Sequence, residues 1–81
     1  MPILRMTGVL EETGHRSHAS IYAAIKDGLF TTGVAIGQRS VGWPDYEVRA
    51  INAARIAGKS DDQIRELVKV LHAKRTELAP A

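Results

Sequence analysis

The fold is decided by residues 14–43, which read GHRSHASIYAAIKDGLFTTGVAIGQRSVGW. Gly14 can end a preceding helix in the left-handed conformation, and after a tight turn Ser17 is a good N-cap for a helix that ends near Gly28. The apolar residues that follow alternate as they do in strands, and residues 37–40 (GQRS) interrupt the alternation. The stretch therefore predicts a turn, a helix and a β-hairpin.

The residues before this stretch predict a short first helix. Residues 3–5 (ILR) can form a short strand or an extended lead-in. Thr7 can cap the helix, which carries Val9 and Leu10 into the core and stops at Gly14. Together with the helix that starts after Ser17, this makes a helix, a short turn and a second helix.

A third helix is predicted directly after the hairpin. Proline is tolerated in the first turn of a helix, and acidic side chains are favourable at its positive end. Pro44, Asp45 and Glu47 therefore mark a helix start, and we expect this helix to stop near Gly58.

A fourth helix is predicted from about residue 61 towards residue 78. Ser60 and Gln63 have the spacing of a capping box at its start. We interpret residues 1–58 as one domain and residues 59–81 as an amphipathic helix that packs on this domain or on a partner subunit. The apolar stripe of this helix consists of Ile64, Leu67, Val68, Leu71 and Leu78.

The composition fits one small domain. The 81 residues are 44% apolar and include no cysteine, which excludes disulfides, thiolate catalysis and cysteine-ligated zinc. No stretch approaches the roughly 20 apolar residues of a membrane span, so we expect no membrane association and a cytoplasmic, nucleoid-associated location. The net charge is only +2, but residues 14–43 contain three Arg or Lys residues against the single acidic Asp27. The middle of the chain is therefore locally positive.

The helix that follows Ser17 is predicted to have one apolar face and one small, polar face. With a step of about 100° per residue, Ala24 and Ile25 fall on the same side as Ile21. A small outward face allows a helix to approach another surface closely. This face consists of Ala19, Ala23 and Lys26, flanked by Ser20 and Tyr22.

These elements predict a mainly α fold with a small β-hairpin, a winged helix-turn-helix with an extra C-terminal helix. Such a fold presents the N-terminal part of its second helix to the major groove of double-stranded DNA, and its hairpin can reach an adjacent groove or phosphate. Each candidate contact can instead be a solvated surface residue, and Tyr22 can instead be a half-buried ring of the core. We expect Trp43 in the core. The candidate DNA contacts are Arg16, Ser17, His18, Ala19, Ser20, Tyr22, Ala23, Lys26, Gln38, Arg39 and Ser40.

The sequence resembles the AlpA family of phage-type regulators, which is related to the winged helices of excisionases and the MerR group. The resemblance implies DNA-binding regulation, often of genes on prophages or integrated elements. Family members commonly carry an arginine where His18 stands and a basic residue where Ala23 stands. The resemblance covers about residues 3–57 and continues through Glu47 and Val48. It rests on four segments: residues 9–14 (VLEETG), 17–22 (SHASIY), 25–30 (IKDGLF) and 36–43 (IGQRSVGW).

Three functions are consistent with these features. The leading hypothesis is a sequence-specific transcriptional regulator of AlpA type. An excisionase-like architectural factor would use the same surface to bend DNA, and a protein-interaction adaptor would use the C-terminal helix. We also consider a homodimer through residues 61–78.

Catalysis and ligand binding have little support in the sequence. The sequence shows no catalytic pair of a nucleophile with a general base and no Gly-rich phosphate loop. The histidines lack the spacing of a metal site. We therefore expect no enzyme activity, no cofactor, no metal and no small-molecule ligand.

Overall fold

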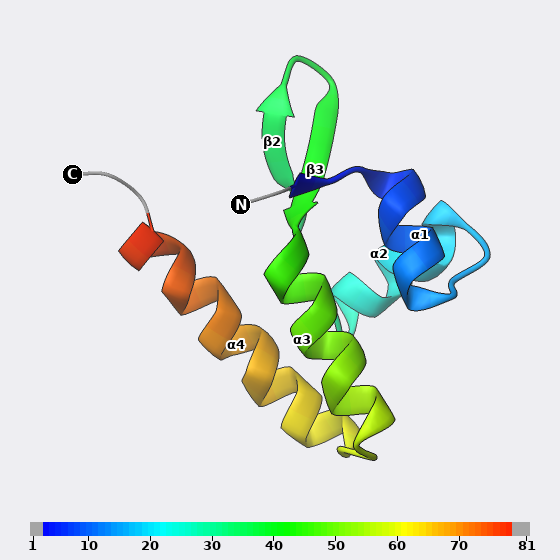
Figure 1. Cartoon of the computed structure of the whole chain (residues 1–81), viewed down its shortest axis with the longest axis vertical. Helices are drawn as coiled ribbons and strands as arrows, with labels where there is room; N and C mark the ends of the chain where they lie inside the picture. Colours follow the sequence, from blue (N-terminus) through cyan, green and yellow to red (C-terminus); the bar gives the residue numbers. More distant parts are fainter. Residues whose placement is uncertain (1–2, 79–81) are drawn as a thin grey trace.

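The computed structural model describes residues 3–78 and has the predicted order of elements (Figure 1). Helices dominate, and three short strands form one antiparallel sheet, which confirms a mainly α fold compatible with a winged helix-turn-helix. The elements are β1 (Ile3–Leu4), α1 (Met6–Thr13), α2 (His18–Lys26), β2 (Val34–Gly37), β3 (Ser40–Pro44), α3 (Asp45–Ile56) and α4 (Asp61–Leu78).

The sheet has the order β1-β3-β2, so the N-terminal strand lies at the base of the hairpin. Leu4 is paired with Trp43, and on the other side of β3 Val34 is paired with Gly42. The hairpin of β2 and β3 extends away from the helices as the wing (Figure 1). Of the two alternatives for residues 3–5, the short strand is present, as Ile3–Leu4, and it joins the wing to the body of the molecule.

Local capping residues determine where the helices begin and end. Gly14 ends α1 with φ of 76°, and the Ser17 side chain accepts a hydrogen bond from the Ser20 N–H at the start of α2. At the start of α4, the Ser60 and Gln63 side chains each bond the backbone N–H of the other, as the capping box predicts. These predictions are confirmed.

The predicted cap at Thr7 is wrong. The first helix begins at Met6, and its N-cap is Arg5, which makes no side-chain capping bond. The reason is tertiary, because β1 ends at Leu4 where it pairs with β3 and the chain turns into the helix at once. Pro44 similarly is the N-cap of α3 and the last residue of β3, one position before the predicted first turn.

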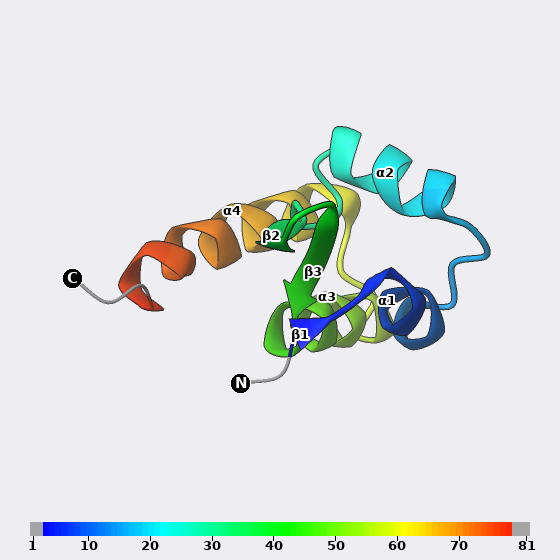
Figure 2. The ribbon, with the colours of Figure 1, turned by 90° about the horizontal axis from the view of Figure 1, so that it is seen from above.

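The core is built around Trp43 and receives side chains from all four helices. The Trp43 ring is fully buried, and its centroid lies 6.3 Å from that of Phe30. In two views α4 begins close to the end of α3 and runs to the side of β3 away from α1 (Figures 1 and 2). The buried apolar residues are Val9, Ile21, Phe30, Trp43, Val48, Ile51, Ile64, Val68 and Leu71.

The apolar stripe of α4 thus packs on the core of its own chain. Ile64, Val68 and Leu71 belong to the buried cluster, and Leu67 packs against its edge. The side chain of Leu78, which was predicted on the same face, lies outside the described residues.

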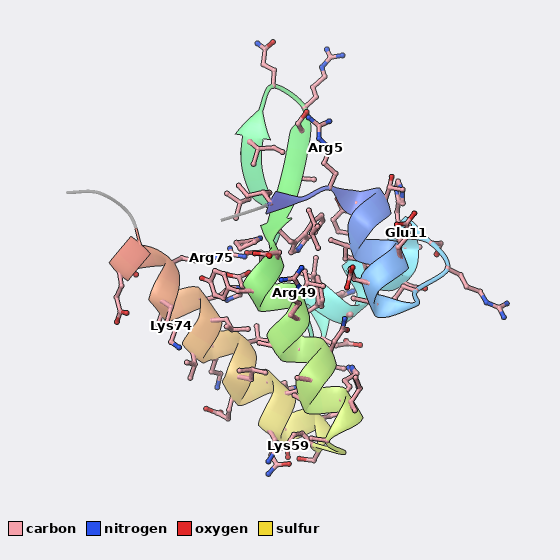
Figure 3. All side chains as sticks on the ribbon, in the orientation of Figure 1. Arg5, Glu11, Arg49, Lys59, Lys74 and Arg75 are labelled. Carbon is pink, nitrogen blue, oxygen red and sulfur yellow. The ribbon has the colours of Figure 1, made fainter. Side chains whose placement is uncertain are left out.

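A buried ion pair joins α3 to α4. Glu47 has no solvent exposure, and both of its carboxylate oxygens accept hydrogen bonds from Arg75, at 2.7 Å from Nε and 2.6 Å from Nη2. The Arg75 side chain reaches from α4 towards the start of α3 (Figure 3). Its Nη2 also donates to the Thr32 carbonyl at 2.7 Å, so one guanidinium connects α4, α3 and the segment before the wing.

Removing one partner of this pair should be costly. Arg75→Met leaves the Glu47 carboxylate buried without its cation, and we expect a loss of about 2 to 3 kcal/mol in the free energy of unfolding, because Arg75 itself is partly exposed. The double variant Glu47→Met with Arg75→Met should recover most of this loss. Urea unfolding followed by Trp43 fluorescence measures both, and a single variant as stable as the unmodified chain contradicts the role given to the pair.

Tyr46 gives the stability of the fold a dependence on alkaline pH. Burial raises the pKa of Tyr46 above 10.0, the Glu47 carboxylate raises it further, and Arg75 lowers it. Its hydroxyl is buried and has no hydrogen-bond partner within residues 3–78. The folded state therefore holds the phenol proton more tightly than the unfolded chain does. This contribution to stability is fully present below the ordinary pKa and is lost as the pH rises through the folded-state pKa.

The variant Tyr46→Phe removes an unpaired buried hydroxyl. We expect the free energy of unfolding at pH 7 to be unchanged or up to about 1 kcal/mol higher, with a smaller decline above pH 10. Urea titrations at pH 7 and above pH 10 measure the free energy of unfolding under both conditions. Tyr22→Phe is the matched control, since Tyr22 is half exposed, and it should keep the alkaline decline. A decline equally steep in Tyr46→Phe refutes the assignment.

Candidate nucleic-acid interface

The second helix presents the predicted face to solvent. Within α2, Ile21 is the buried residue, and Ala24 and Ile25 are partly buried against the core. The opposite side of the helix and the turn before it are open. Arg16, Ser17, His18, Ala19, Tyr22, Ala23 and Lys26 are exposed, and Ser20 is half-buried.

The structure decides the exposure of Tyr22 and the role of Ser17, which the sequence pattern left open. Tyr22 is 51% exposed, so it is a surface ring and not a core ring. Ser17 uses its hydroxyl oxygen to cap α2, accepting from the Ser20 N–H at 3.3 Å. The exposed outer face of α2 is therefore small except for His18, Tyr22 and the cation Lys26.

The tip of the wing carries the remaining predicted residues. Gln38 and Arg39 form the two-residue loop between β2 and β3 and are exposed, and Ser40 is half-buried. Arg39 has φ of 63°, in the left-handed region that favours glycine. An arginine there costs roughly 1 kcal/mol relative to glycine. Strain of this kind at an exposed tip is consistent with a functional side chain.

Most of the basic residues fall into two groups by their partners, and Lys59 and Lys74 belong to neither group. In α3 and α4, five of them form ion pairs with nearby carboxylates: Arg49, Arg55, Arg65, Lys69 and Arg75.

The basic residues between β1 and β3 have no such partner. Arg5, Arg16, Lys26 and Arg39 form no ion pair within residues 3–78. These four charges lie at the start of α1, in the turn, on α2 and on the wing, and they remain available to an anionic partner.

Arg5 was not among the predicted contacts. It is exposed, and its side chain extends alongside the wing (Figure 3). In the sequence it reads only as the end of an extended segment, since the pairing of β1 with β3 that places it beside the wing joins residues far apart in the chain.

Comparison with known proteins agrees with this geometry. A scan against family models matches residues 2–55 to the family described as Prophage CP4-57 regulatory protein (AlpA). The chain belongs to the AlpA family. Membership implies a prophage regulatory protein that binds DNA, and it confirms the resemblance found in the sequence. Searches of curated proteins and of solved structures found no match.

The AlpA match and the described structure have different extents. The match includes the turn, α2 and the wing and ends within α3, so α4 lies beyond it.

None of the helices within residues 3–78 has the length and apolar character needed to cross a membrane.

Arg39 allows loop strain to be separated from DNA contact. Arg39→Gly relieves the left-handed conformation and should raise the free energy of unfolding by up to about 1 kcal/mol relative to Arg39→Ala, which keeps the strain. Both variants lose the guanidinium and should bind duplex DNA more weakly. Urea unfolding and fluorescence anisotropy with labelled DNA measure the two effects. A glycine variant less stable than the alanine variant contradicts the strain.

Proposed function

We propose that this protein is a sequence-specific transcriptional regulator of AlpA type that places α2 in the major groove of DNA and the wing on the flanking backbone. The observation that carries the proposal is the division of the basic residues. Arg16, Lys26 and Arg39 are exposed and unpaired among the described residues on the turn, α2 and the wing, whereas those of α3 and α4 include five engaged in ion pairs.

The unpaired cations would hold the protein on the phosphates. Arg16 and Lys26 lie at opposite ends of α2, where each can reach a strand bordering the groove. Arg39 at the wing tip suits a backbone or minor-groove contact, with Gln38 and Ser40 beside it.

The outer face of α2 supports close approach to the bases. Ala19 and Ala23 allow the helix backbone to come near the groove floor and can contact thymine methyl groups. Ser17, His18, Ser20 and Tyr22 offer polar contacts at the edges. The outer face of α2 has no Arg, Asn or Gln, so base readout by this helix is limited, and specificity depends on Arg16, the wing and DNA shape.

A homodimer through residues 61–78 stays a prediction. Ile64, Val68 and Leu71 are already buried in the core of the single chain, so a second copy would have to use other residues of α4, such as the half-exposed Val70.

Regulation by DNA binding requires no catalytic step. We accordingly propose no enzyme activity and no cofactor for this protein.

The proposal is tested by selecting bound duplexes from a random library and measuring affinity for the recovered duplex as salt is varied. Arg16→Ala with Arg39→Ala should weaken binding and reduce the slope of log K against log salt by up to about 2, since each phosphate contact contributes about 0.9. Lys59→Ala with Lys74→Ala is the matched control, because it also removes two cations that form no ion pair within the described residues.

The control should leave the affinity and the salt slope close to those of the unmodified chain. Lys59 and Lys74 lie at the end of α3 and on α4, away from the wing (Figure 3). Equal losses in both double variants would indicate attraction by net charge alone, and an unchanged affinity in the first would overturn the placement of the surface.

A further inference from the structure

We propose that α4 is a bracket that fixes the distance and angle between α2 and the wing, through three side chains that hold the segment joining them. This segment, residues 27–33, is called the linker here. The three side chains are Arg65, His72 and Arg75. The proposal rests on the proposed function, because it assigns to α4 the spacing between the two DNA-contacting elements.

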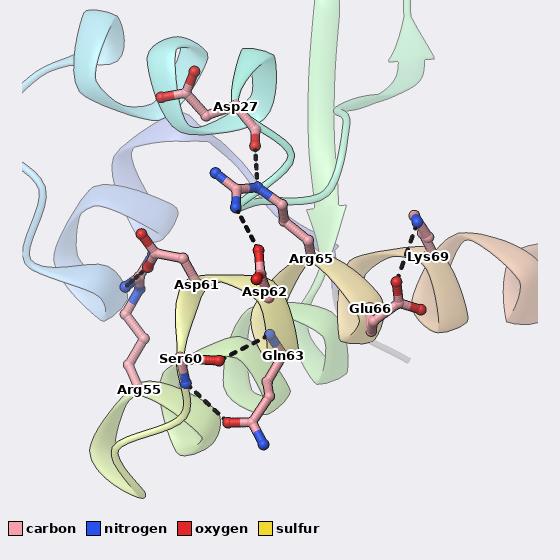
Figure 4. A network of polar contacts seen from close by, with 9 residues as sticks. All are labelled: Asp27, Arg55, Ser60, Asp61, Asp62, Gln63, Arg65, Glu66 and Lys69. Carbon is pink, nitrogen blue, oxygen red and sulfur yellow. Dashed lines mark hydrogen bonds and ion pairs between the residues drawn. The ribbon is translucent and has the colours of Figure 1, made fainter.

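Arg65 holds the first end of the linker. Its Nε donates to the carbonyl of Asp27, the C-cap of α2, at 2.9 Å, and its Nη1 is paired with Asp62 at 3.0 Å (Figure 4). The stem of Arg65 also lies against Gly28, where an added Cβ would be 3.5 Å from Cγ. The end of α2 is therefore tied to the first turns of α4.

His72 and Arg75 hold the other end of the linker at Thr32. The Thr32 N–H donates to His72 Nε2 at 3.1 Å, and its carbonyl accepts from Arg75 Nη2 at 2.7 Å. Arg75 Nη1 also donates to the Thr32 hydroxyl at 3.2 Å. Both backbone polar groups of this residue are thus bonded by α4 side chains. In a regular helix or strand, other backbone groups would form these hydrogen bonds; here the side chains of α4 form them instead.

The bracket is rigid because Arg75 is itself held in place. The buried Glu47 carboxylate binds two nitrogens of its guanidinium, and α3, which carries Glu47, follows β3 without a loop. The wing therefore continues into α3, α3 holds Arg75, and Arg75 holds the linker that leads back into the wing. Arg65 connects α2 to the same helix.

The middle of the linker is held by the core, where Phe30 and Thr31 are buried and the Thr31 carbonyl accepts from Trp43 Nε1 at 2.8 Å. The two ends of the linker depend on the bonds from α4. It has no helix or strand, and it contains Gly28, with φ of 77°, and Gly33. Without the bonds from α4, only this central anchor would hold the linker, so the angle between α2 and the wing would vary more, and binding DNA would then carry the cost of fixing it. All three bracket residues lie beyond residues 2–55, so the AlpA match does not include them.

The test uses the full chain with His72→Ala, alone and combined with Arg65→Ala, and leaves Arg75 unchanged because of its buried partner. His72→Gln keeps a side-chain acceptor for the Thr32 N–H and should therefore lose less of the amide protection at Thr32 than His72→Ala does. The matched control is Glu66→Ala with Lys69→Ala, an exposed ion pair on α4 that forms no bond to the linker within the described residues.

The first measurement is made without DNA. Amide hydrogen exchange at Thr32 should be about fivefold faster in the bracket variants, and residual dipolar couplings should show a changed or averaged angle between α2 and the wing. The control should match the unmodified chain. Unchanged exchange and angle in the variant lacking both Arg65 and His72 overturn the bracket. This result does not depend on whether the protein binds DNA.

The second measurement compares the selected duplex with the same duplex carrying one extra base pair between the sites of α2 and the wing. The unmodified chain should prefer the original duplex by about tenfold, and the bracket variants should lose most of this preference by binding the original duplex less well. A preference retained in full, despite faster exchange at Thr32, overturns the assignment of site spacing to α4. Failure of any duplex to bind would reject the proposed function and leave the first measurement to decide on the bracket.

Discussion

The arrangement of the chain depends on the contact between Glu47 and Arg75. A fully buried carboxylate is tolerated only when its charge is compensated and its oxygens are bonded, and one arginine does both. The same guanidinium fixes Thr32, so a requirement of the core also determines where the wing begins. One side chain thereby contributes both to stability and to the position of the segment that leads into the wing.

The division of the basic residues explains how a chain with little net charge can bind a polyanion. Five arginines and lysines of α3 and α4 are paired with carboxylates, which reduces their contribution to the field around the molecule. The four basic residues from Arg5 to Arg39 have no such compensation within residues 3–78. These four cations lie on or beside the elements that expose the outer face of α2 and the wing tip.

Most of the fold could be predicted from local signals in the sequence. Gly14, Ser17 and the Ser60 and Gln63 pair act within one helical turn, so their spacing alone indicates the element boundaries. The Thr7 cap was wrong because the pairing of β1 with β3 decides where α1 starts.

The site was predicted less completely. The exposed face of α2 follows from helical periodicity, and the structure places those residues at the surface. The linker contacts of α4 could not be found in this way, because Arg75 and Thr32 are 43 positions apart and no periodic pattern connects them. Glu47 likewise reads in the sequence only as a favourable charge at a helix start.

The position of α4 in the core has a consequence for how the protein can be divided. Ile64, Val68 and Leu71 complete the same cluster as Trp43 and Val48, although the AlpA match ends at residue 55. A fragment cut at the end of the recognised region would expose that apolar surface to water and strand the Glu47 charge. The packed core is thus larger than the region that sequence comparison recognises, and α4 contributes to it as α2 does.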